Sequence, residues 1–408
     1  MSLFPSVAGR SRYRSFATFA TALATIFAIG CAPSPADTAP TAATPPATVA
    51  QAMQPYVDNN TVAGLVLLTA TKDKVLDITP VGYADIASKT PMKADTEFWI
   101  ASMTKAMTAT AFMTLVDAGK IGLDDPVSKY IPEFATDKTW PIVANKNDKV
   151  AQPPTATHDI TVREILSHSA GLGFSSPFER PTLDVHSLAD RVVSYTKMPL
   201  IYDPGSEYSY SNAGINTAGR IIEVVSGEPY AQYMQEHVFD PLQMTDTTFA
   251  PTKEQIARLA TSYQYVEATN NLKPINISQL KYPLDDPSRQ PMPAGGLFST
   301  ASDVAKFCQM LLRGGTTVDG KQLISQSSVA AMTTKETPSG VTVAYGFGLG
   351  VGATSFGHAG AYGTSMNVDK KHGIIRIYMI QQVGGNREEQ QKMQNALGVA
   401  NAHLVGQP

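Results

Sequence analysis

The stretch Ser102-Met103-Thr104-Lys105 places a hydroxyl nucleophile three residues before an amine. The run Ala106–Ala118 that follows contains no Pro or Gly and no charge before Asp117, which predicts a fully packed helix that begins with Ser102. Residues three apart lie on one face of a helical turn, so the amine would face the hydroxyl. A helix N-terminus also offers unpaired N–H groups and a partial positive charge. The tetrad therefore predicts a nucleophile beside a possible base.

The tetrad by itself has another interpretation, because serine is a common helix cap and a first-turn lysine is usually solvated. Two further motifs follow it along the chain. Tyr210-Ser211-Asn212 lies in a turn-rich loop before a helix expected at Ile215–Ser226, and His358-Ala359-Gly360 lies between strand-like runs. Each motif alone is typical of a structural loop. Together, in this order, the three motifs favour a single catalytic site.

Local patterns predict the elements that must position these motifs. The runs Gly64–Ala70 and Lys74–Val81, on either side of Thr71-Lys72-Asp73, predict a β-hairpin. From about residue 119 to about residue 287 the pattern favours helices and long loops. Further elements are expected near the C-terminus: strands Tyr345–Val351, Ser365–Val368 and Ile374–Gln381, and a helix from about Glu388 to His403.

With these motifs the chain resembles the serine β-lactamase and penicillin-binding-protein superfamily, in its class C-like branch. That branch also holds family VIII carboxylesterases, D-alanyl-D-alanine carboxypeptidases and D-aminopeptidases. The resemblance runs from about Val49 to about Val399, and its longest flanking matches are Asp124–Phe134, Ile160–Leu172, Pro241–Met244 and Pro293–Thr300. It implies an α/β (α+β) fold of the β-lactamase/transpeptidase type, in which an antiparallel sheet from both ends of the chain is flanked by helices. A helical insertion would occupy about residues 119–287.

The resemblance implies that Ser102 Oγ attacks an acyl carbon and forms an acyl-enzyme. Lys105 and Tyr210 have ordinary pKa values of about 10.4 and about 10, so each needs a shifted pKa to act as a base at neutral pH. We expect the two to act as a coupled pair that shares a proton with Ser102. Which of the two is the resting base stays open, and Tyr210 is the better candidate for returning the proton to the leaving group.

The other site residues are expected to bind the substrate. By the same resemblance, the backbone N–H groups of Ser102 and Ala361, the residue after Gly360, would form the oxyanion hole. Asn212 would hold the acyl side chain or orient the lysine, and His358 would lie at the pocket wall. The resemblance calls for no cofactor and no metal, and the histidines of the chain lack the spacing of a zinc site.

His358 departs from the class C β-lactamases, in which the third motif is similar to Lys-Thr-Gly. A lysine supplies a permanent cation for a substrate carboxylate, whereas a histidine is mostly neutral at pH 7. This difference favours a carboxylesterase that acts on small uncharged esters. Two alternatives remain open: a β-lactamase, D,D-carboxypeptidase or D-aminopeptidase, and a non-catalytic sensor that traps an acyl group.

Composition sets the broad class of the protein. The chain has 408 residues, a formal net charge of −3 and 43% hydrophobic residues, which suits a globular enzyme with a sizeable core. The sequence carries no excess of basic residues of the kind that would indicate binding to nucleic acid. The chain has two Cys, which exclude a disulfide framework. No G-x-S-x-G occurs, which excludes the nucleophile elbow of the α/β-hydrolases.

The N-terminus predicts export and lipid anchoring. Arginines within residues 10–14 precede an uncharged, mostly apolar run at residues 15–30, which is typical of a secretory signal. The run ends in Ala28-Ile29-Gly30-Cys31, which resembles a bacterial lipobox. We therefore expect a signal peptide at 1–31, a lipid anchor on Cys31, a Pro/Ala/Thr-rich tether at 32–48 and a periplasmic hydrolase domain at 49–405. An ordinary signal peptide that is cleaved nearby is the alternative.

Overall fold

The computed structural model describes residues 48–135, 140–143, 154–180 and 183–404, with side chains described up to residue 400. The chain divides into two units, 1–42 and 43–408, and the following concerns the second unit alone. The predicted signal peptide, the lipobox cysteine Cys31 and nearly all of the tether lie outside the described residues. Among the described helices, none is long and apolar enough to cross a bilayer.

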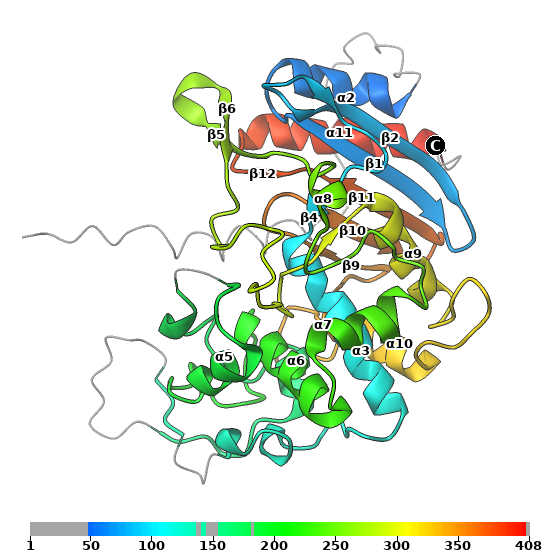
Figure 1. Ribbon diagram of the computed structural model, residues 1–408. Helices are drawn as coiled ribbons and strands as arrows, with labels where there is room; N and C mark the ends of the chain where they lie inside the picture. The colour runs from blue at the N-terminus through cyan, green and yellow to red at the C-terminus, as the bar shows by residue number, and fades with distance from the viewer. Residues whose placement is uncertain (1–47, 136–139, 144–153, 181–182, 405–408) are drawn as a thin grey trace, which may run out of the picture. The chain divides into compact units, whose positions relative to one another are not determined.

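An antiparallel sheet of seven strands, in the order β3-β2-β1-β11-β10-β9-β8, joins both ends of the described chain. Val66 of β1 pairs with Met379 of β11 at the junction, and Figure 1 shows the two strands side by side. The strands are β1 (Gly64–Thr71), β2 (Val75–Asp85), β3 (Thr90–Pro91), β8 (Gly350–Val351), β9 (Ser355–Ala359), β10 (Ser365–Asp369) and β11 (Ile374–Met379). The fold class that the sequence predicts, an antiparallel sheet flanked by helices, is confirmed.

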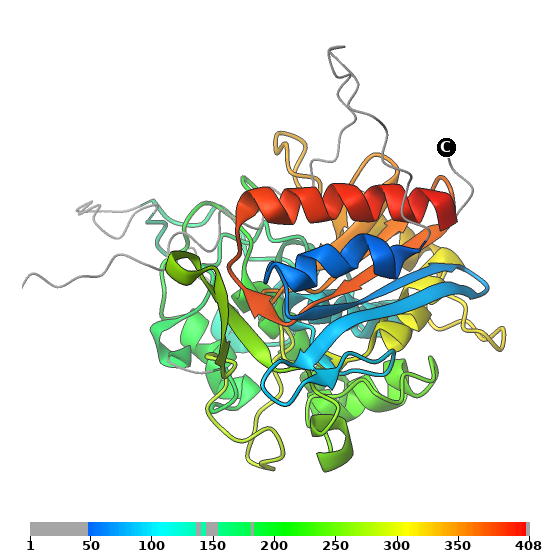
Figure 2. The ribbon, with the colours of Figure 1, turned by 90° about the horizontal axis from the view of Figure 1, so that it is seen from above.

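Two terminal helices cover one face of this sheet. Helices α2 (Val49–Asp58) and α11 (Arg387–Leu404) lie side by side (Figure 2). Leu65 and Leu67 of β1 pack into the cluster beneath them, while Val66 and Leu68 point into the main core on the other face. Because both faces of β1 are buried, its sequence is a continuous apolar run instead of an alternating one.

The main core surrounds α3 (Thr104–Asp117), in which every side chain from Thr104 to Met113 is buried. The helix packs against α6 (Asn212–Ser226), α7 (Tyr230–Met234) and α10 (Gln326–Thr333), and α9 (Ala301–Leu312) fills the space between the core and the sheet. Packing on all sides is the reason that α3 is apolar all round.

The approach to α3 differs in one detail from the prediction of a helix that begins with Ser102. Strand β4 (Phe98–Trp99) ends in a separate 3-10 turn, η1 (Ala101–Met103), and α3 starts at Thr104. Ala101, the residue before Ser102, has φ +45°, a left-handed conformation at the point where the chain turns from β4 into η1. The Thr104 hydroxyl donates to the Ala101 carbonyl at 2.6 Å and stabilises the turn that presents Ser102.

The region 119–287 begins with helices and ends with a hairpin. Its helices include α4 (Val162–Leu166), α5 (Leu188–Tyr195), α6, α7 and α8 (Lys253–Ile256). Strands β5 (Ser262–Val266) and β6 (Asn271–Ile275) then pair with each other, and β5 pairs in parallel with β12 (Gln382–Val383). The sequence pattern predicted helices and loops here and missed this hairpin. The small sheet is completed by β12, which lies more than a hundred residues away, so a local pattern does not reveal it.

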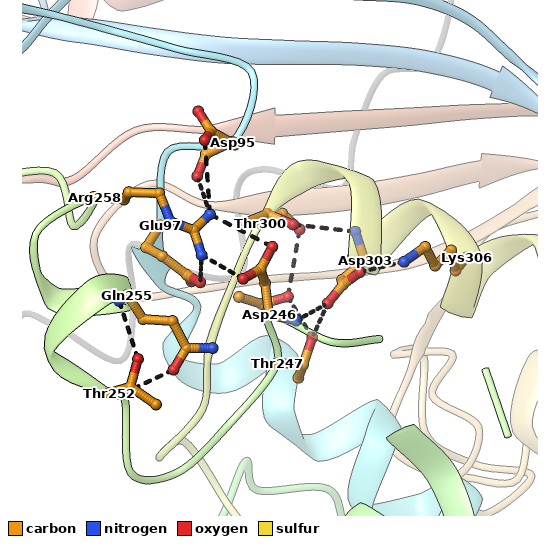
Figure 3. A network of polar contacts seen from close by, with 11 residues as sticks. Asp95, Glu97, Asp246, Thr247, Thr252, Gln255, Arg258, Thr300, Asp303 and Lys306 are labelled. Carbon is orange, nitrogen blue, oxygen red and sulfur yellow. Dashed lines mark hydrogen bonds and ion pairs between the residues drawn. The ribbon is translucent and has the colours of Figure 1, made fainter. Parts of the chain in front are cut away.

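Charged side chains anchor the strand that leads to Ser102 (Figure 3). Arg258 contacts Asp246 and donates to the Asp95 carbonyl at 2.7 Å, and it lies 3.6 Å from the Glu97 carboxyl. Glu97 is buried just before β4. Burial raises the pKa of Glu97 to about 9, and the nearby carboxylate of Asp246 adds to the shift. Glu97 therefore holds a proton at neutral pH.

Candidate active site

The nucleophile and the amine meet as the tetrad predicts. Lys105, in the first turn of α3, directs Nζ at Ser102 Oγ at 3.2 Å and donates to the Ala294 carbonyl at 2.6 Å. Ser102 is half-buried, whereas Lys105 is fully buried. Burial holds the pKa of Lys105 well below its ordinary value, because the charged amine loses its hydration. A neutral amine beside Ser102 can accept the hydroxyl proton.

Tyr210 reaches the same point from the loop before α6. Its ring centroid lies 4.7 Å from Lys105 Nζ, and its hydroxyl lies 3.5 Å from His358 Nε2. Burial raises the pKa of Tyr210 above its ordinary value, and the Ser102 side chain only partly opposes this shift. The opposite pKa shifts of Lys105 and Tyr210 favour a neutral amine and a protonated phenol in the resting enzyme.

His358, near the end of β9, completes the polar cluster as a neutral ring. Nδ1 lies 2.8 Å from the Ala359 carbonyl, so Nδ1 carries the proton and Nε2 is an acceptor. Nε2 lies 3.1 Å from the Tyr345 hydroxyl and 3.5 Å from the Tyr210 hydroxyl. Burial lowers the pKa of His358 to about 3, because the charged ring would lose its hydration. The site therefore has no permanent cation at the position of the third motif.

Gly360 allows the end of β9 to approach the nucleophile turn. A Cβ at Gly360 would lie 2.2 Å from Thr364 Oγ1 and 2.4 Å from the Ile100 carbonyl oxygen, both closer than real side chains allow. The Gly360 N–H donates to the Thr364 carbonyl at 2.7 Å, so this N–H is already used within the protein and is not free for a substrate oxygen. The next residue, Ala361, is exposed, and its N–H as the second oxyanion donor stays a prediction.

Asn212 follows Tyr210 by two residues in the sequence. It begins α6, and its side chain is buried. Its backbone N–H donates to the Phe174 carbonyl at 3.1 Å. Its side-chain oxygen Oδ1 is buried and has no hydrogen-bond partner in the described parts of the chain. A buried acceptor left unpaired costs free energy, which a donor group on a bound substrate would recover.

The carbonyl that holds Lys105 is itself fixed by side chains that the motif search did not single out. Asn216, one turn after Asn212 in α6, accepts from the Ala294 N–H at 3.1 Å. The Thr108 hydroxyl of α3 donates to the neighbouring Pro293 carbonyl at 2.7 Å. The signal was present in the flanking match Pro293–Thr300, but the sequence could not show which of its groups faces the lysine.

Two aromatic residues near the site also went unassigned in the sequence. Tyr345 donates toward His358 from the run that the sequence predicted as a strand. The ring centroid of His168 lies 4.6 Å from that of Tyr210 and 4.7 Å from that of Tyr345. The resembling segment Ile160–Leu172 contains this histidine, so its position in that match was the available signal.

One group of possible metal ligands lies apart from these residues. Glu228, Glu236 and His237 offer ligand atoms within 4.8 Å of one another, and none of them belongs to the cluster around Ser102. The side chains gathered around Ser102 are an amine, a phenol and an imidazole.

Similar proteins are found among protein families, curated sequences and solved structures. The family model described as Beta-lactamase matches residues 49–401. Protein Rv1367c of Mycobacterium tuberculosis (strain ATCC 25618 / H37Rv) is 31% identical over 366 residues, which cover 79% of this chain and 87% of that protein. Esterase EstB of Burkholderia gladioli is 29% identical over 212 residues, 49% of this chain and 50% of that protein. The structure of EstCE1, a hydrolase with promiscuous acyltransferase activity, matches with a TM-score of 0.70 and 26% identity over 86% of this chain and 97% of that one.

Proposed function

Because the chain belongs to the β-lactamase family and is a serine hydrolase of that fold, we propose that it is a carboxylesterase acting on small, uncharged esters. The observation that carries this proposal is the neutral state of His358, whose pKa lies near 3. A carboxylate-bearing substrate would find no permanent cation at this position. Similarity to EstB and EstCE1, which are named an esterase and a hydrolase, supports the same assignment.

Acylation follows from the geometry of three side chains. Lys105 Nζ takes the proton of Ser102 as Oγ attacks the ester carbonyl, and the N–H groups of Ser102 and Ala361 stabilise the oxyanion. Tyr210 gives its proton to the departing alkoxide, and protonated Lys105 then restores the proton to the phenolate. One proton thus passes from Ser102 to the alcohol, and the acyl group remains on Oγ.

Deacylation reverses the direction of proton transfer. Water attacks the acyl carbonyl, its proton is accepted by the Lys105–Tyr210 pair, and Ser102 Oγ regains a proton as the acid leaves. A linear acyl group leaves the path to the carbonyl open. The opened ring of a β-lactam would stay in the site and hinder water, so this step also favours an ester.

An exposed aromatic side chain next to the site supports an apolar substrate. Phe174 is 52% exposed, and its ring centroid lies 6.3 Å from that of Tyr210. The Phe174 carbonyl accepts from the Asn212 N–H, so this segment is tied to the catalytic loop. An acyl or alcohol chain that covers Phe174 would gain free energy from the burial of apolar surface.

The test is the turnover of p-nitrophenyl butyrate and of nitrocefin by the purified full chain and by its Ser102→Ala variant. We expect fast ester cleavage and slow or absent nitrocefin cleavage, with both lost in the variant. Dominant nitrocefin cleavage would refute the esterase assignment. Ester cleavage that survives in the variant would refute the role of Ser102.

A second candidate rests on Asn212. Its buried, unpartnered Oδ1 is suited to accept a hydrogen bond from an amide N–H, a group that β-lactams and D-amino-acid peptides carry and simple esters lack. A β-lactamase, D,D-carboxypeptidase or D-aminopeptidase is therefore the alternative. Replacement of Asn212 by Leu should raise KM for amide-bearing substrates only, and an equal effect on p-nitrophenyl butyrate would remove this support.

We also propose that Cys31 carries a lipid and that residues 32–48 tether a periplasmic enzyme to the membrane. The support is the lipobox-like sequence after an apolar run. In a bacterial host, Cys31→Ser should abolish incorporation of labelled palmitate and move the enzyme from the membrane fraction to the soluble fraction. Unchanged labelling would refute the anchor.

A further inference from the structure

His168 accepts hydrogen bonds from both backbone N–H groups that flank Tyr210. The Ser209 N–H donates to the His168 carbonyl at 3.0 Å, and the Ser211 N–H donates to the ring nitrogen Nδ1 at 3.2 Å. The Tyr202 hydroxyl donates to the same carbonyl at 3.0 Å. The loop is therefore attached to one residue immediately before and immediately after Tyr210.

The hydrogen bond at Nδ1 determines the tautomer of His168. Because a backbone N–H can only donate, Nδ1 keeps its lone pair and the neutral ring carries its proton on Nε2. Nε2 is buried and has no hydrogen-bond partner among residues 48–135, 140–143, 154–180 and 183–400. Burial holds the pKa of His168 well below its ordinary value. The ring therefore stays neutral and keeps its acceptor.

The ring also orients the hydroxyls around His358. It packs against Tyr210 and Tyr345, with centroid distances of 4.6 Å and 4.7 Å, and its exposed fraction is 2%. Both tyrosine hydroxyls reach Nε2 of His358. A side chain of another shape at position 168 would leave the Tyr210 ring without the neighbour that sets its tilt.

The backbone of His168 is in a conformation that L-residues rarely adopt. Its φ is +61°, just after the end of α4. A non-glycine residue in this region costs free energy and persists only where its surroundings hold it. The strained turn places the carbonyl and the ring of His168 on the same short loop, which is how one residue can accept from both sides of Tyr210.

We propose that His168 is the positioning residue of Tyr210: its neutral ring and its carbonyl hold the phenol where it delivers a proton to the leaving group. This inference rests on the proposed function, in which Tyr210 is the general acid. His168 itself need not touch substrate.

The test compares His168→Leu with His168→Asn. Leucine removes the acceptor for the Ser211 N–H, whereas asparagine keeps an oxygen near the position of Nδ1 and tolerates positive φ. Each variant is assayed on ethyl butyrate, whose alkoxide needs a proton to leave, and on p-nitrophenyl butyrate, whose phenolate does not. Tyr202→Phe is the matched control, since it removes a hydrogen bond to the His168 carbonyl and leaves the ring contacts in place.

We expect His168→Leu to lower kcat for ethyl butyrate by roughly 100-fold and for p-nitrophenyl butyrate by less than about tenfold, with KM nearly unchanged, because a misplaced general acid matters most for a poor leaving group. His168→Asn should recover most of the loss. In a Tyr210→Phe background, His168→Leu should have little further effect. Equal losses on both esters, or a full additional loss in that background, would overturn the proposal.

The Asn variant gives a result that does not depend on whether the Leu variant folds. Its kcat for ethyl butyrate should stay within about tenfold of the wild type, and a loss of roughly 100-fold would contradict the role of the Nδ1 acceptor. If the wild type cleaves neither ester, the proposed function fails by itself. The same variants are then compared on nitrocefin acylation, where the leaving nitrogen also needs a proton and the same order of rates is expected.

Discussion

The reactivity of Lys105 depends on its burial more than on any single contact. The amine is fully buried, and its nearest acceptors are Ser102 Oγ and one backbone carbonyl. In the described parts of the chain no carboxylate pairs with Lys105 to retain its charge, so desolvation shifts its protonation equilibrium. The shift favours a neutral base over a cation beside the nucleophile.

A pH-rate profile tests the protonation state of Lys105. Because the base must be neutral, kcat/KM for p-nitrophenyl butyrate should rise with pH through the lowered pKa of Lys105 and reach its plateau well below 10.5. Lys105→Arg should reduce kcat/KM by about 100-fold or more, since guanidinium stays protonated. An acid limb centred near 10.5 would contradict the buried neutral amine.

The charge at position 358 tests the choice between esters and β-lactams. His358→Lys should raise nitrocefin turnover by about tenfold, because an ionic hydrogen bond to the substrate carboxylate contributes roughly 1.5–3 kcal/mol. His358→Gln, which adds no charge, is the control and should leave nitrocefin turnover low. A Lys variant no faster than the Gln variant would refute the argument from charge.

At the scale of elements, the site depends on how closely β9 approaches the turn η1. The two elements are in contact, and the absence of a side chain at Gly360 permits this. The strand brings His358 to the Tyr210 hydroxyl, while α3 and the loop before α6 bring Lys105 and Tyr210 together. Three separate segments of the chain therefore form one polar cluster beside Ser102.

Gly360→Ala should separate these elements. The new Cβ would lie 2.4 Å from the Ile100 carbonyl, so the strand end or the nucleophile turn must shift. We expect kcat for p-nitrophenyl butyrate to fall by about 100-fold or more, the effect of losing an oxyanion donor. Gly340→Ala is the matched control, since a Cβ there meets open space, and it should keep wild-type activity. Normal activity in Gly360→Ala would contradict the close approach.

At the scale of the whole molecule, the network in Figure 3 joins distant segments in the second unit. Arg258 connects the strand leading to Ser102 with Asp246. Asp303 of α9 accepts from the backbone N–H of Asp246 at 2.7 Å. The protonated carboxyl of Glu97 lies within this network, so folding stability and pH are coupled there.

Glu97 should make the protein less stable as pH rises. Its folded pKa of about 9 lies above its ordinary value of 4.5, so the folded state binds the proton more tightly than the unfolded state. The stabilisation is complete below pH 4.5 and is lost as pH rises toward 9. Urea unfolding at pH 5.5, 7 and 8.5 should show a decline of up to about 1.4 kcal/mol per pH unit relative to Glu97→Gln. Parallel pH dependence in the two proteins would contradict a buried neutral carboxyl.

The sequence predicted much of the fold because its signals are local. The hairpin at Gly64–Val81 and the C-terminal helix correspond to β1–β2 and α11, whose apolar runs and turn residues lie within one segment. Hairpin β5–β6 was missed because its stabilising partner, β12, lies far along the chain. The start of α3 lies two residues after the predicted one, because Ser102 and Met103 belong to the 3-10 turn η1.

The sequence by itself determined which chemical groups are available and their order along the chain, since Ser102, Lys105, Tyr210 and His358 all belong to short motifs. Only the tertiary structure decided the burial that shifts their pKa values and the placement of His168 against Tyr210. The physical reason is that a pKa shift depends on desolvation, and desolvation is produced by segments more than a hundred residues apart that close around the same point. A motif specifies the types of its side chains, whereas the packed core determines how far each is removed from water.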